Sequence, residues 1–578
     1  MWREAAAAGI QTAPGFRFII RVDPLMTDTG RTGNLRTPVL IVGGGMVGLS
    51  LAVELGTRSV DCIIINDGAT EAAHPQGNSL NSRTMEHYRR LGLADQVRAA
   101  GLPPDHPTDV VYITRFAGWE LARLPMPSSA EKLRDRTNSE HTKLTPEPLH
   151  RANFFYIETI LKQRAEALAS VDVRFGWRLL EFEQHEGSVT ALVEHVIDGS
   201  RHSIACDWLV GCDGAHSTVR QALGIDYGGK GGEDETFMRG RMLSCYVEAP
   251  GLLDLMPLTP GWHYWTVNAD ARASVATLDA NGKYVALTRI PPGVEFADVD
   301  PAASFRATVG ADIPIKVHSA KPWTAGLALV AERYQDRRVL MAGDAVHLFT
   351  PTGGFGMNTG VDDIANLAWK LAAVVQGWAP PALLDSYEIE RHPIGVRNTA
   401  MSHQFASAVA NLEIPPELER NNSAGEAARR QIGAHLATFT EEFRSLGIQL
   451  GARYQNSPLI ADGDESPPED SPFEYQPSTV PGGRAPHYWL SDGRALFDVF
   501  ASGFTLLRLA EAAPDGADLA SAAAARGVPL RVVTITDGGL RDVYQRDLVL
   551  IRPDQHVAWR ANREPDDAAG LIARIIGG

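Results

Sequence analysis

Three glycines near the start of the chain have a spacing that suits phosphate binding. Gly43, Gly45 and Gly48 form the pattern G-x-G-x-x-G. Gly43 permits a tight turn, Gly45 leaves room for a phosphate because it has no Cβ, and Gly48 permits close packing of a helix on a strand. Free N–H groups and the positive dipole end at the start of that helix stabilise an anion. The pattern predicts a dinucleotide-binding turn that includes Met46 and Val47.

The residues around this turn fit a strand before it and a helix after it. Residues 39–42 are apolar and include β-branched side chains, which predicts a strand buried on both faces. Residues 49–55 have the composition of a helix that packs on the sheet. A second strand, 62–65, should end at an acidic residue that binds a ribose hydroxyl. That position holds Asn66, whose carbonyl can accept from a hydroxyl, and Asp67 is the second candidate.

Two later strands end in similar turns. An apolar strand ends in Gly211-Cys212-Asp213-Gly214, and the strand 339–341 is followed by Gly343-Asp344. A glycine-rich loop, residues 351–358, then leads into a helix with apolar residues at helical spacing, which are Ile364, Leu367, Ala368, Leu371 and Val375. The positive end of that helix would stabilise negative charge on a flat ligand pressed against the loop.

The order of these three turns resembles that of the class A flavoprotein monooxygenases, aromatic hydroxylases that include p-hydroxybenzoate hydroxylase and phenol hydroxylase. The resemblance covers about residues 37–400. In that family the first turn holds the ADP half of FAD, the second serves the flavin and nicotinamide pyrophosphates, and the third binds the flavin ribitol. The resemblance implies further contacts to non-covalent FAD from Asp213, Gly214, Gly343, Asp344, Pro351, Gly354, Gly356, Met357 and Asn358.

Two arginines lie in further segments that resemble the family. Arg83 lies in the segment that runs alongside the flavin, and Arg151 lies at the start of a later helix. Either arginine could instead form a surface ion pair. Two residues depart from the family pattern. Phe154 stands where many relatives have a glutamine, and Gln76 stands where many have a basic residue. We therefore expect the contacts to the FAD pyrophosphate to be rearranged.

The resemblance implies an α/β fold, in which a Rossmann-type FAD-binding domain is interleaved with a mixed β-sheet substrate domain and followed by a thioredoxin-like α/β domain. The C-terminal part resembles the phenol and polyketide hydroxylase branch and has no cysteine, which excludes thiol redox chemistry there. The expected parts are a disordered tail (1–36), the FAD-binding domain (37–425) with the substrate sheet inserted at about 95–130 and 232–325, a helical, Pro-rich linker (426–475) and the thioredoxin-like domain (476–578).

Alternating apolar residues in the middle of the chain predict strands with one covered face. Residues 262–267 and 284–288 have this pattern. By resemblance their sheet covers the flavin ring and forms the substrate pocket. Oxygen transfer from a flavin hydroperoxide depends on an electron-rich ring more than on a protein base, so the catalytic residues stay open. His263 is a candidate base for a phenol, since imidazole titrates near neutrality.

Net charge and cysteine content limit the binding partners and the cellular compartment that the sequence predicts. The net charge of -16 opposes binding to nucleic acid or to an anionic membrane. The four cysteines lack metal or disulfide spacing, so we expect no metal site and a reducing cytoplasm. No apolar run reaches the length of about 18 residues that spans a bilayer. Translation could begin at Met1 or at Met26, and a homodimer is compatible with the sequence.

The resemblance implies hydroxylation of a phenolic or polyketide-type aromatic substrate with NADPH or NADH and O2. One alternative is a Baeyer–Villiger or epoxidising monooxygenase, because cofactor motifs do not determine which group is oxidised. A flavin-binding protein without turnover is a third hypothesis. A two-dinucleotide reductase is disfavoured, because we find no second strand, G-x-G-x-x-G and helix in the sequence.

Overall fold

The computed structural model describes residues 35–70, 74–230, 240–256, 259–291, 293–410, 412–440, 443–461, 463 and 465–578. Met26 and residues 1–34 of the expected tail lie outside the described residues. The tail was expected to extend to residue 36, but strand β1 (Leu35–Val42) already begins at Leu35. The extension arises because Leu35 and Arg36 pair with β8 (Arg201–Gly211), and Arg36 also lies 2.9 Å from Asp207.

The main sheet brings the predicted turns to one edge. Its strand order is β16-β17-β8-β1-β2-β5, with β7 added to β8 and β6 to β7. The remaining strands of this sheet are β2 (Cys62–Asn66), β5 (Val171–Phe175), β6 (Trp177–Gln184), β7 (Val189–His195), β16 (Gln335–Asp336) and β17 (Val339–Met341). Because β2, β1, β8 and β17 are neighbours and run parallel, their carboxyl ends lie side by side.

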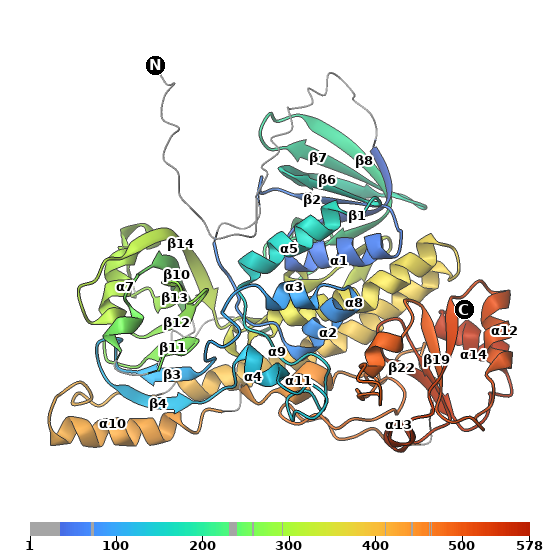
Figure 1. The fold of residues 1–578 in the computed structure, drawn as a ribbon. Coiled ribbons are helices and arrows are strands. Elements are labelled where there is room, and N and C mark those ends of the chain that lie inside the picture. The colour runs from blue at the N-terminus through green and yellow to red at the C-terminus, as the bar shows by residue number, and fades with distance from the viewer. Residues whose placement is uncertain are drawn as a thin grey trace, which may run out of the picture.

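Three helices pack together behind this edge. Helix α1 (Met46–Thr57) contacts both α5 (Phe154–Glu166) and α8 (Gly356–Val375), and Figure 1 shows α1 and α5 against the sheet. Of the apolar residues predicted to face the core from α8, Ile364, Leu367, Ala368 and Leu371 are buried, and Val375 is partly buried against the same core. The remaining helices of this part are α2 (Ser82–Arg90), α3 (Ala94–Arg98), α4 (Ser129–Leu133), α6 (Thr218–Ala222), α9 (Asp385–Ala410) and α11 (Leu446–Leu450).

A second sheet is built from two separate stretches of the chain. Its order is β14-β10-β13-β12-β11-β3-β4, and it is mixed because β11 and β3 run parallel. The strands are β3 (Val110–Ile113), β4 (Glu120–Leu124), β10 (Gly240–Glu248), β11 (His263–Thr266), β12 (Ala273–Thr277), β13 (Lys283–Arg289) and β14 (Lys316–Ala325). One face packs against α7 (Pro301–Val309). We call the other the cavity face, because Met242 and Ser244 on it line the cavity described below.

Two smaller features connect this second sheet to the rest. Helix α10 (Ser423–Leu436), in the region expected to be a linker, packs on β4 through Ile432 and Leu436. A short sheet consists of β9 (Tyr227–Lys230), β15 (Ala328–Ala331) and β18 (His347–Leu348). In the sequence, β9 and β15 lie in the segments that connect the two large sheets. Among the described helices, none has both the length and the apolar composition needed to cross a bilayer.

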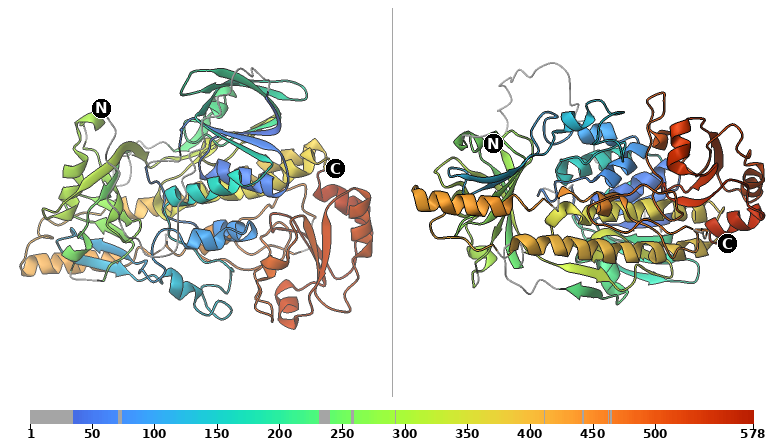
Figure 2. Two further views of the ribbon diagram at one scale, coloured as in Figure 1. Left: turned by 45° about the horizontal axis from the view of Figure 1, so that its top comes forward. Right: turned by 90° about the horizontal axis from the view of Figure 1, so that it is seen from below.

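The C-terminal domain is a four-stranded sheet with helices. Its order is β20-β19-β21-β22, in which β19 and β20 are parallel and the other pairs antiparallel. Its elements are β19 (Phe504–Arg508), β20 (Leu530–Thr534), β21 (Leu548–Ile551), β22 (Val557–Ala561), α12 (Ala517–Ala525), α13 (Gly538–Tyr544) and α14 (Ala568–Ile575). Phe504 packs against Trp369 of α8. Figures 1 and 2 show this domain and the second sheet at opposite ends, with the main sheet between them.

Candidate active site

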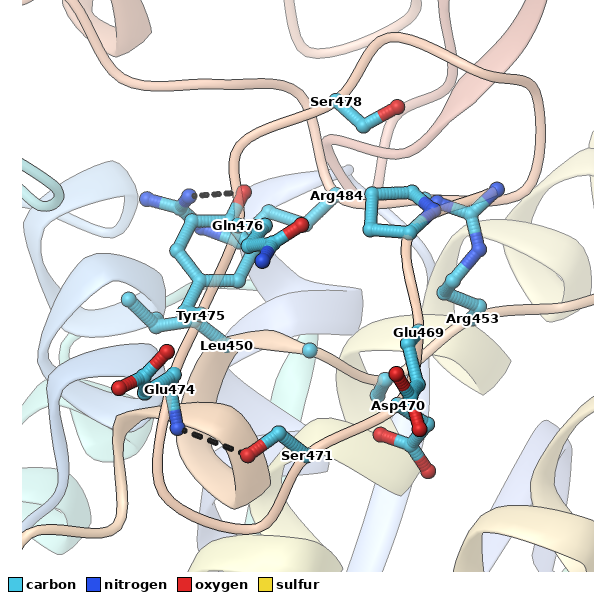
Figure 3. A pocket seen from close by; sticks show the side chains of 14 residues that line it. Leu450, Arg453, Glu469, Asp470, Ser471, Glu474, Tyr475, Gln476, Ser478 and Arg484 are labelled. Atoms are coloured by element: carbon cyan, nitrogen blue, oxygen red, sulfur yellow. Dashed lines mark hydrogen bonds between the residues drawn. The ribbon is translucent and has the colours of Figure 1, made fainter. Parts of the chain in front are cut away.

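A large cavity lies where the edge of the main sheet, the cavity face of the second sheet and the start of α8 meet. Its volume is about 1510 Å³. Pockets for drug-sized ligands occupy about 300–1,000 Å³, so this cavity has room for a dinucleotide and a further small molecule. A second hollow, between Arg453, Asp470 and Arg484, is shown in Figure 3. Its volume of about 30 Å³ admits water but no cofactor.

The first turn has the geometry that its three glycines predicted. Gly43 has a φ of +109°, and a Cβ there would lie 2.2 Å from the carbonyl oxygen of Cys212. A Cβ on Gly48 would lie 1.9 Å from the carbonyl oxygen of Gly43, so helix and strand are in close contact. A Cβ on Gly45 would meet only Glu158 Oε1, at 3.8 Å, because this glycine faces the cavity. The side chains of Met46 and Val47 line the same wall.

Two of the helices that begin at the cavity, α1 and α8, lack side-chain caps, unlike several others. In α2, α5 and α10, an N–H group of the first turn donates a hydrogen bond to the side chain of Asn81, Asn153 or Asn422, respectively. No described side chain caps α1 at Gly45 or α8 at Phe355. Uncapped N–H groups and the positive helix end favour an anionic ligand. The two helix starts therefore fit a pyrophosphate and a negatively charged ring.

Asn66 and Asp67 both line the cavity, but they differ in their partners. Asn66 Oδ1 accepts a hydrogen bond of 3.0 Å from the Gly44 N–H, and its amide donates to the Gly68 carbonyl at 3.3 Å. Asn66 therefore holds the glycine turn in place while keeping one lone pair of its carbonyl for a ligand. Asp67 is exposed to the cavity.

The aspartates of the two later turns also reach the cavity. Asp213 accepts from Ser217 Oγ at 2.6 Å and from the Val219 N–H at 3.1 Å, so it stabilises the start of α6. Burial raises its pKa, and these hydrogen bonds partly offset the rise. Asp344 is exposed to the cavity, and no described group donates a hydrogen bond to its carboxylate. A free acceptor of this kind fits the hydroxyls of a sugar or of ribitol.

The glycine-rich loop lines the cavity between the turns and α8. Pro351, Gly354, Gly356 and Met357 all lie on its wall. Gly354 has a φ of +68°, and a Cβ there would lie 3.1 Å from Ser79 Cβ, so the loop lies close to the segment before α2.

Four predicted contact residues do not line the cavity. Gly48 and Gly343 lie behind it, where they permit close backbone packing. The Asn358 side chain accepts from the Asn81 N–H at 2.9 Å and donates to the carbonyls of Ser79 and Gly354, so it positions the loop.

Arg83, the fourth of these residues, belongs to a buried polar network. It donates to Asp362, Glu86 and Gln555 and to the Asp554 carbonyl. Its side chain is therefore committed to contacts between α2, α8 and the C-terminal domain, and it does not line the cavity.

Arg151 does line the cavity. Its Nη1 donates to Ser79 Oγ at 2.7 Å, and its guanidinium lies 3.8 Å from the centroid of the Trp262 ring. The two positions that depart from the family pattern, Gln76 and Phe154, line the cavity as well.

Further cavity residues were not predicted from the sequence. Glu158 lies four residues after Phe154 on the same face of α5, a spacing that could have indicated it. On the cavity face of the second sheet, the wall includes Met242, Ser244, Trp265, Ser274, Val285, Leu287 and Trp323. The alternation of these strands predicted two faces but did not show which one meets the cavity.

His263 lies in this wall but is a weak base. Its Nε2 lies 2.6 Å from Ser274 Oγ. Burial, and then the charge of Arg151, lower the pKa of His263 to about 3. An imidazole with that pKa is neutral near pH 7 and retains a proton poorly. The geometry therefore favours a hydrogen-bonding role for His263 over deprotonation of a phenol.

Two family models match most of the chain. The family model described as FAD binding domain matches residues 36–402. The model described as the C-terminal part of aromatic-ring hydroxylases matches residues 478–577. The chain therefore belongs to the FAD-binding aromatic-ring hydroxylase family, and the resemblance found in the sequence is confirmed.

Individual relatives extend over nearly the whole chain. FAD-dependent monooxygenase apdD of Emericella nidulans is 31% identical, covering 93% of this chain and 90% of its own. Phenol 2-monooxygenase of a Pseudomonas species is 29% identical, and the match covers 96% of this chain and 94% of that enzyme. Among solved structures, the rebeccamycin biosynthetic enzyme RebC with reduced flavin has a TM-score of 0.84 at 32% identity and covers 94% of this chain and 100% of its own. The expected fold class is thereby confirmed.

Proposed function

We propose that this protein is an FAD-dependent monooxygenase that hydroxylates an aromatic ring, with NADPH or NADH as reductant and O2 as oxidant. The observation that carries the proposal is one continuous cavity that joins two uncapped helix starts at one end to a tryptophan-lined sheet at the other. A dinucleotide and a flat apolar ring are the ligands that such walls accept.

The residues around the cavity suit FAD part by part. Gly43, Gly45, Met46 and Val47 would surround the pyrophosphate, with Asn66 or Asp67 at the adenosine ribose. Asp213 and Gly214 would lie beside the pyrophosphates, and Asp344 would accept from ribitol hydroxyls. Pro351, Gly354, Gly356 and Met357 would support the ring, with Arg151 nearby. Gly48, Gly343, Asn358 and Arg83 would act indirectly, because they position these groups.

FAD, when bound, supplies the electron transfer and oxygen activation that protein side chains cannot provide. The protein's own contribution is binding, orientation and electrostatics. The uncapped start of α8 would stabilise negative charge on a flavin ring held at the loop. The apolar cavity face excludes water from the reacting atoms. No protein base is required, which agrees with the weak basicity of His263.

The nicotinamide nucleotide would have to reach the same cavity. Within the described residues, the main sheet contains one dinucleotide-binding unit, made of a strand, a G-x-G-x-x-G turn and a helix. The C-terminal sheet has no such turn. A transient visit, in which hydride is delivered and the nucleotide then leaves, is consistent with a cavity whose other contents are FAD and substrate.

Anaerobic mixing tests the reductive half of the proposal. The purified holoprotein should lose its flavin absorbance on addition of NADPH or NADH in the presence of an aromatic substrate. Gly45→Val is the comparison variant, because its side chain would project into the cavity where the pyrophosphate would lie. It should bind FAD poorly and should show little change in flavin absorbance. A flavin that stays oxidised with both nucleotides and a broad substrate panel would contradict an enzymatic role.

Product analysis under ¹⁸O2 separates hydroxylation from ring insertion. With a phenol panel, we expect one labelled oxygen on a ring carbon. Turnover of cyclic ketones to labelled lactones, without turnover of phenols, would instead support the Baeyer–Villiger alternative.

A further inference from the structure

The cavity face of the second sheet is largely apolar, with a few hydroxyl groups. Apolar surface comes from three strands, with Trp265 on β11, Trp323 on β14, and Val285 and Leu287 on β13. Such a surface can hold an aromatic ring, but it gives the ring no preferred orientation. Orientation requires a polar group at a fixed place, and Ser274 is such a group.

Ser274 and His263 form a pair on adjacent strands. In the register of β11 and β12, Trp265 lies opposite Ser274 and Ala276 lies opposite His263, so His263 and Ser274 are diagonal neighbours on one face. His263 Nε2 lies 2.6 Å from Ser274 Oγ. Both residues line the cavity, and Ser274 is only 6% exposed. The pair is therefore held in place by the sheet.

The direction of this hydrogen bond follows from the other ring nitrogen. His263 Nδ1 is buried and has no hydrogen-bond partner among the described residues. A buried N–H without a partner is more costly and rarer than a buried acceptor without one. The proton of the neutral ring is therefore assigned to Nε2, from which it is donated to Ser274 Oγ. The Ser274 hydroxyl then has its own proton available for another acceptor.

We propose that Ser274, oriented by His263, donates a hydrogen bond to an oxygen on the aromatic substrate, either a phenolic or phenolate oxygen or a conjugated carbonyl. Ser274 is thus a specificity residue and His263 its positioning residue. The inference rests on the proposed function, because it concerns the substrate that the cavity would hold. A donated hydrogen bond to such an oxygen fixes which ring carbon faces the flavin side.

A second serine on the same face gives a matched comparison. Ser244 lies opposite Leu287, as Ser274 does, and it also lines the cavity. Its Oγ lies 2.9 Å from His74 Nε2, while His74 Nδ1 lies 2.7 Å from Ser319 Oγ. Both nitrogens of His74 have partners, so neither tautomer leaves an unpaired N–H. The geometry therefore does not determine whether the Ser244 hydroxyl donates to His74 or accepts from it, whereas Ser274 is assigned as the acceptor from His263.

Ligand binding to the oxidised holoprotein, without nicotinamide, tests the inference. The probes are 2-naphthol, 2-acetonaphthone and 2-ethylnaphthalene, which share one ring system and differ in the oxygen. Ser274→Ala should weaken binding of the two oxygen-bearing probes by about 3- to 10-fold, the effect of one neutral hydrogen bond, and leave 2-ethylnaphthalene nearly unchanged. Ser274→Thr should retain the preference, and Ser244→Ala should change the ratio of affinities less than Ser274→Ala does.

Variants of His263 test the pair by a second route. His263→Phe removes the N–H and should reduce the preference for oxygen-bearing probes, whereas His263→Gln, which places an amide N–H near the Nε2 position, should restore part of it. An equal loss for all three probes in Ser274→Ala would overturn the proposal. A wild-type protein with no preference for the oxygen-bearing probes would also overturn it. These measurements need neither flavin reduction nor O2, so their failure is distinct from failure of the anaerobic test.

Discussion

Arg552 of the C-terminal domain donates two parallel hydrogen bonds to Glu390 of α9, at 2.6 and 2.8 Å. Both side chains are fully buried. Lys370 of α8 donates to the same carboxylate at 2.6 Å, and Asp554 accepts from Arg552. Burial alone would raise the pKa of Glu390, but Arg552 and Lys370 lower it below its usual value. The C-terminal domain thus contributes charges to a buried cluster that it shares with α8 and α9.

Removal of one partner from this cluster should be strongly destabilising. Arg552→Met leaves the Glu390 carboxylate buried without its bidentate partner, and such changes cost about 3–5 kcal/mol. Since the cluster includes Lys370 of α8, we also expect weaker retention of FAD. Urea unfolding of the FAD-saturated protein, followed by circular dichroism, gives the free energy of unfolding.

An exposed ion pair provides the control for Arg552→Met. Arg494 and Asp492 lie 2.6 Å apart, with their side chains 61% and 49% exposed. Asp492→Asn should change the free energy of unfolding far less than Arg552→Met does, because water screens an exposed ion pair. Similar small losses in both variants would mean that the buried cluster does not stabilise the domain interface.

The turns of the FAD site could be predicted because their chemistry is local. Gly43, Gly45 and Gly48 act within six consecutive residues, and their backbone geometry follows from the strand and helix on either side. The positions of Asp213 and Asp344 could also be predicted, because parallel strands bring their carboxyl ends to one edge of a sheet.

The partners of Arg83 and the weak basicity of His263 could not be predicted from local sequence. Arg83 contacts Gln555 and Asp554, which follow more than 450 residues later in the chain and belong to another domain. The weak basicity of His263 results from burial beside Arg151, whose segment is also distant in sequence. Such contacts depend on how the domains pack, and no local pattern encodes that.

Gly45→Val should weaken FAD binding without unfolding the protein. The backbone φ of Gly45 is -81°, which any residue adopts, and a Cβ there would contact only Glu158, at 3.8 Å. The valine side chain would instead occupy the space of the pyrophosphate. We expect the dissociation constant of FAD to rise by at least about tenfold, the equivalent of one lost hydrogen bond, with an unchanged melting temperature of the apoprotein.

The matched control for this variant is Gly187→Val, at a glycine where an added Cβ has no neighbour within 4 Å and which does not line the cavity. Fluorescence titration of the apoprotein with FAD measures both variants. Unimpaired binding in Gly45→Val would contradict the placement of the pyrophosphate.

Asp344→Asn tests a cavity carboxylate to which no described group donates a hydrogen bond. Because Asp344 lines the cavity and stabilises no neighbouring backbone through its side chain, the substitution should leave folding intact. Loss of a charged acceptor for ribitol hydroxyls should weaken FAD binding by about 10-fold. Asp213→Asn offers a contrast, because Asp213 also accepts from Ser217 and Val219, and this variant should lower the melting temperature as well.

His487 should make the C-terminal domain sensitive to acid. The side chain is 6% exposed, and neither ring nitrogen has a hydrogen-bond partner among the described residues. Burial, and then the charge of Arg484, lower the pKa of His487 to about 3. As the pH falls below about 6.5, the unfolded state binds a proton that the folded state does not, so stability decreases until the pH approaches the folded pKa. This one residue should contribute a loss of about 1.4 kcal/mol per pH unit within that window.

His487→Phe should remove this contribution. A phenylalanine ring can keep the edge contacts that His487 makes with Trp489 and Phe497, at centroid distances of 4.8 and 5.9 Å. Urea unfolding at about pH 7 and about pH 5.5 should show a smaller decrease in the variant than in the wild type, by roughly 1 kcal/mol. His216→Gln, at an exposed position, is the control and should keep the wild-type decrease. An identical pH dependence in His487→Phe and the wild type would show that this histidine gains a proton without unfolding.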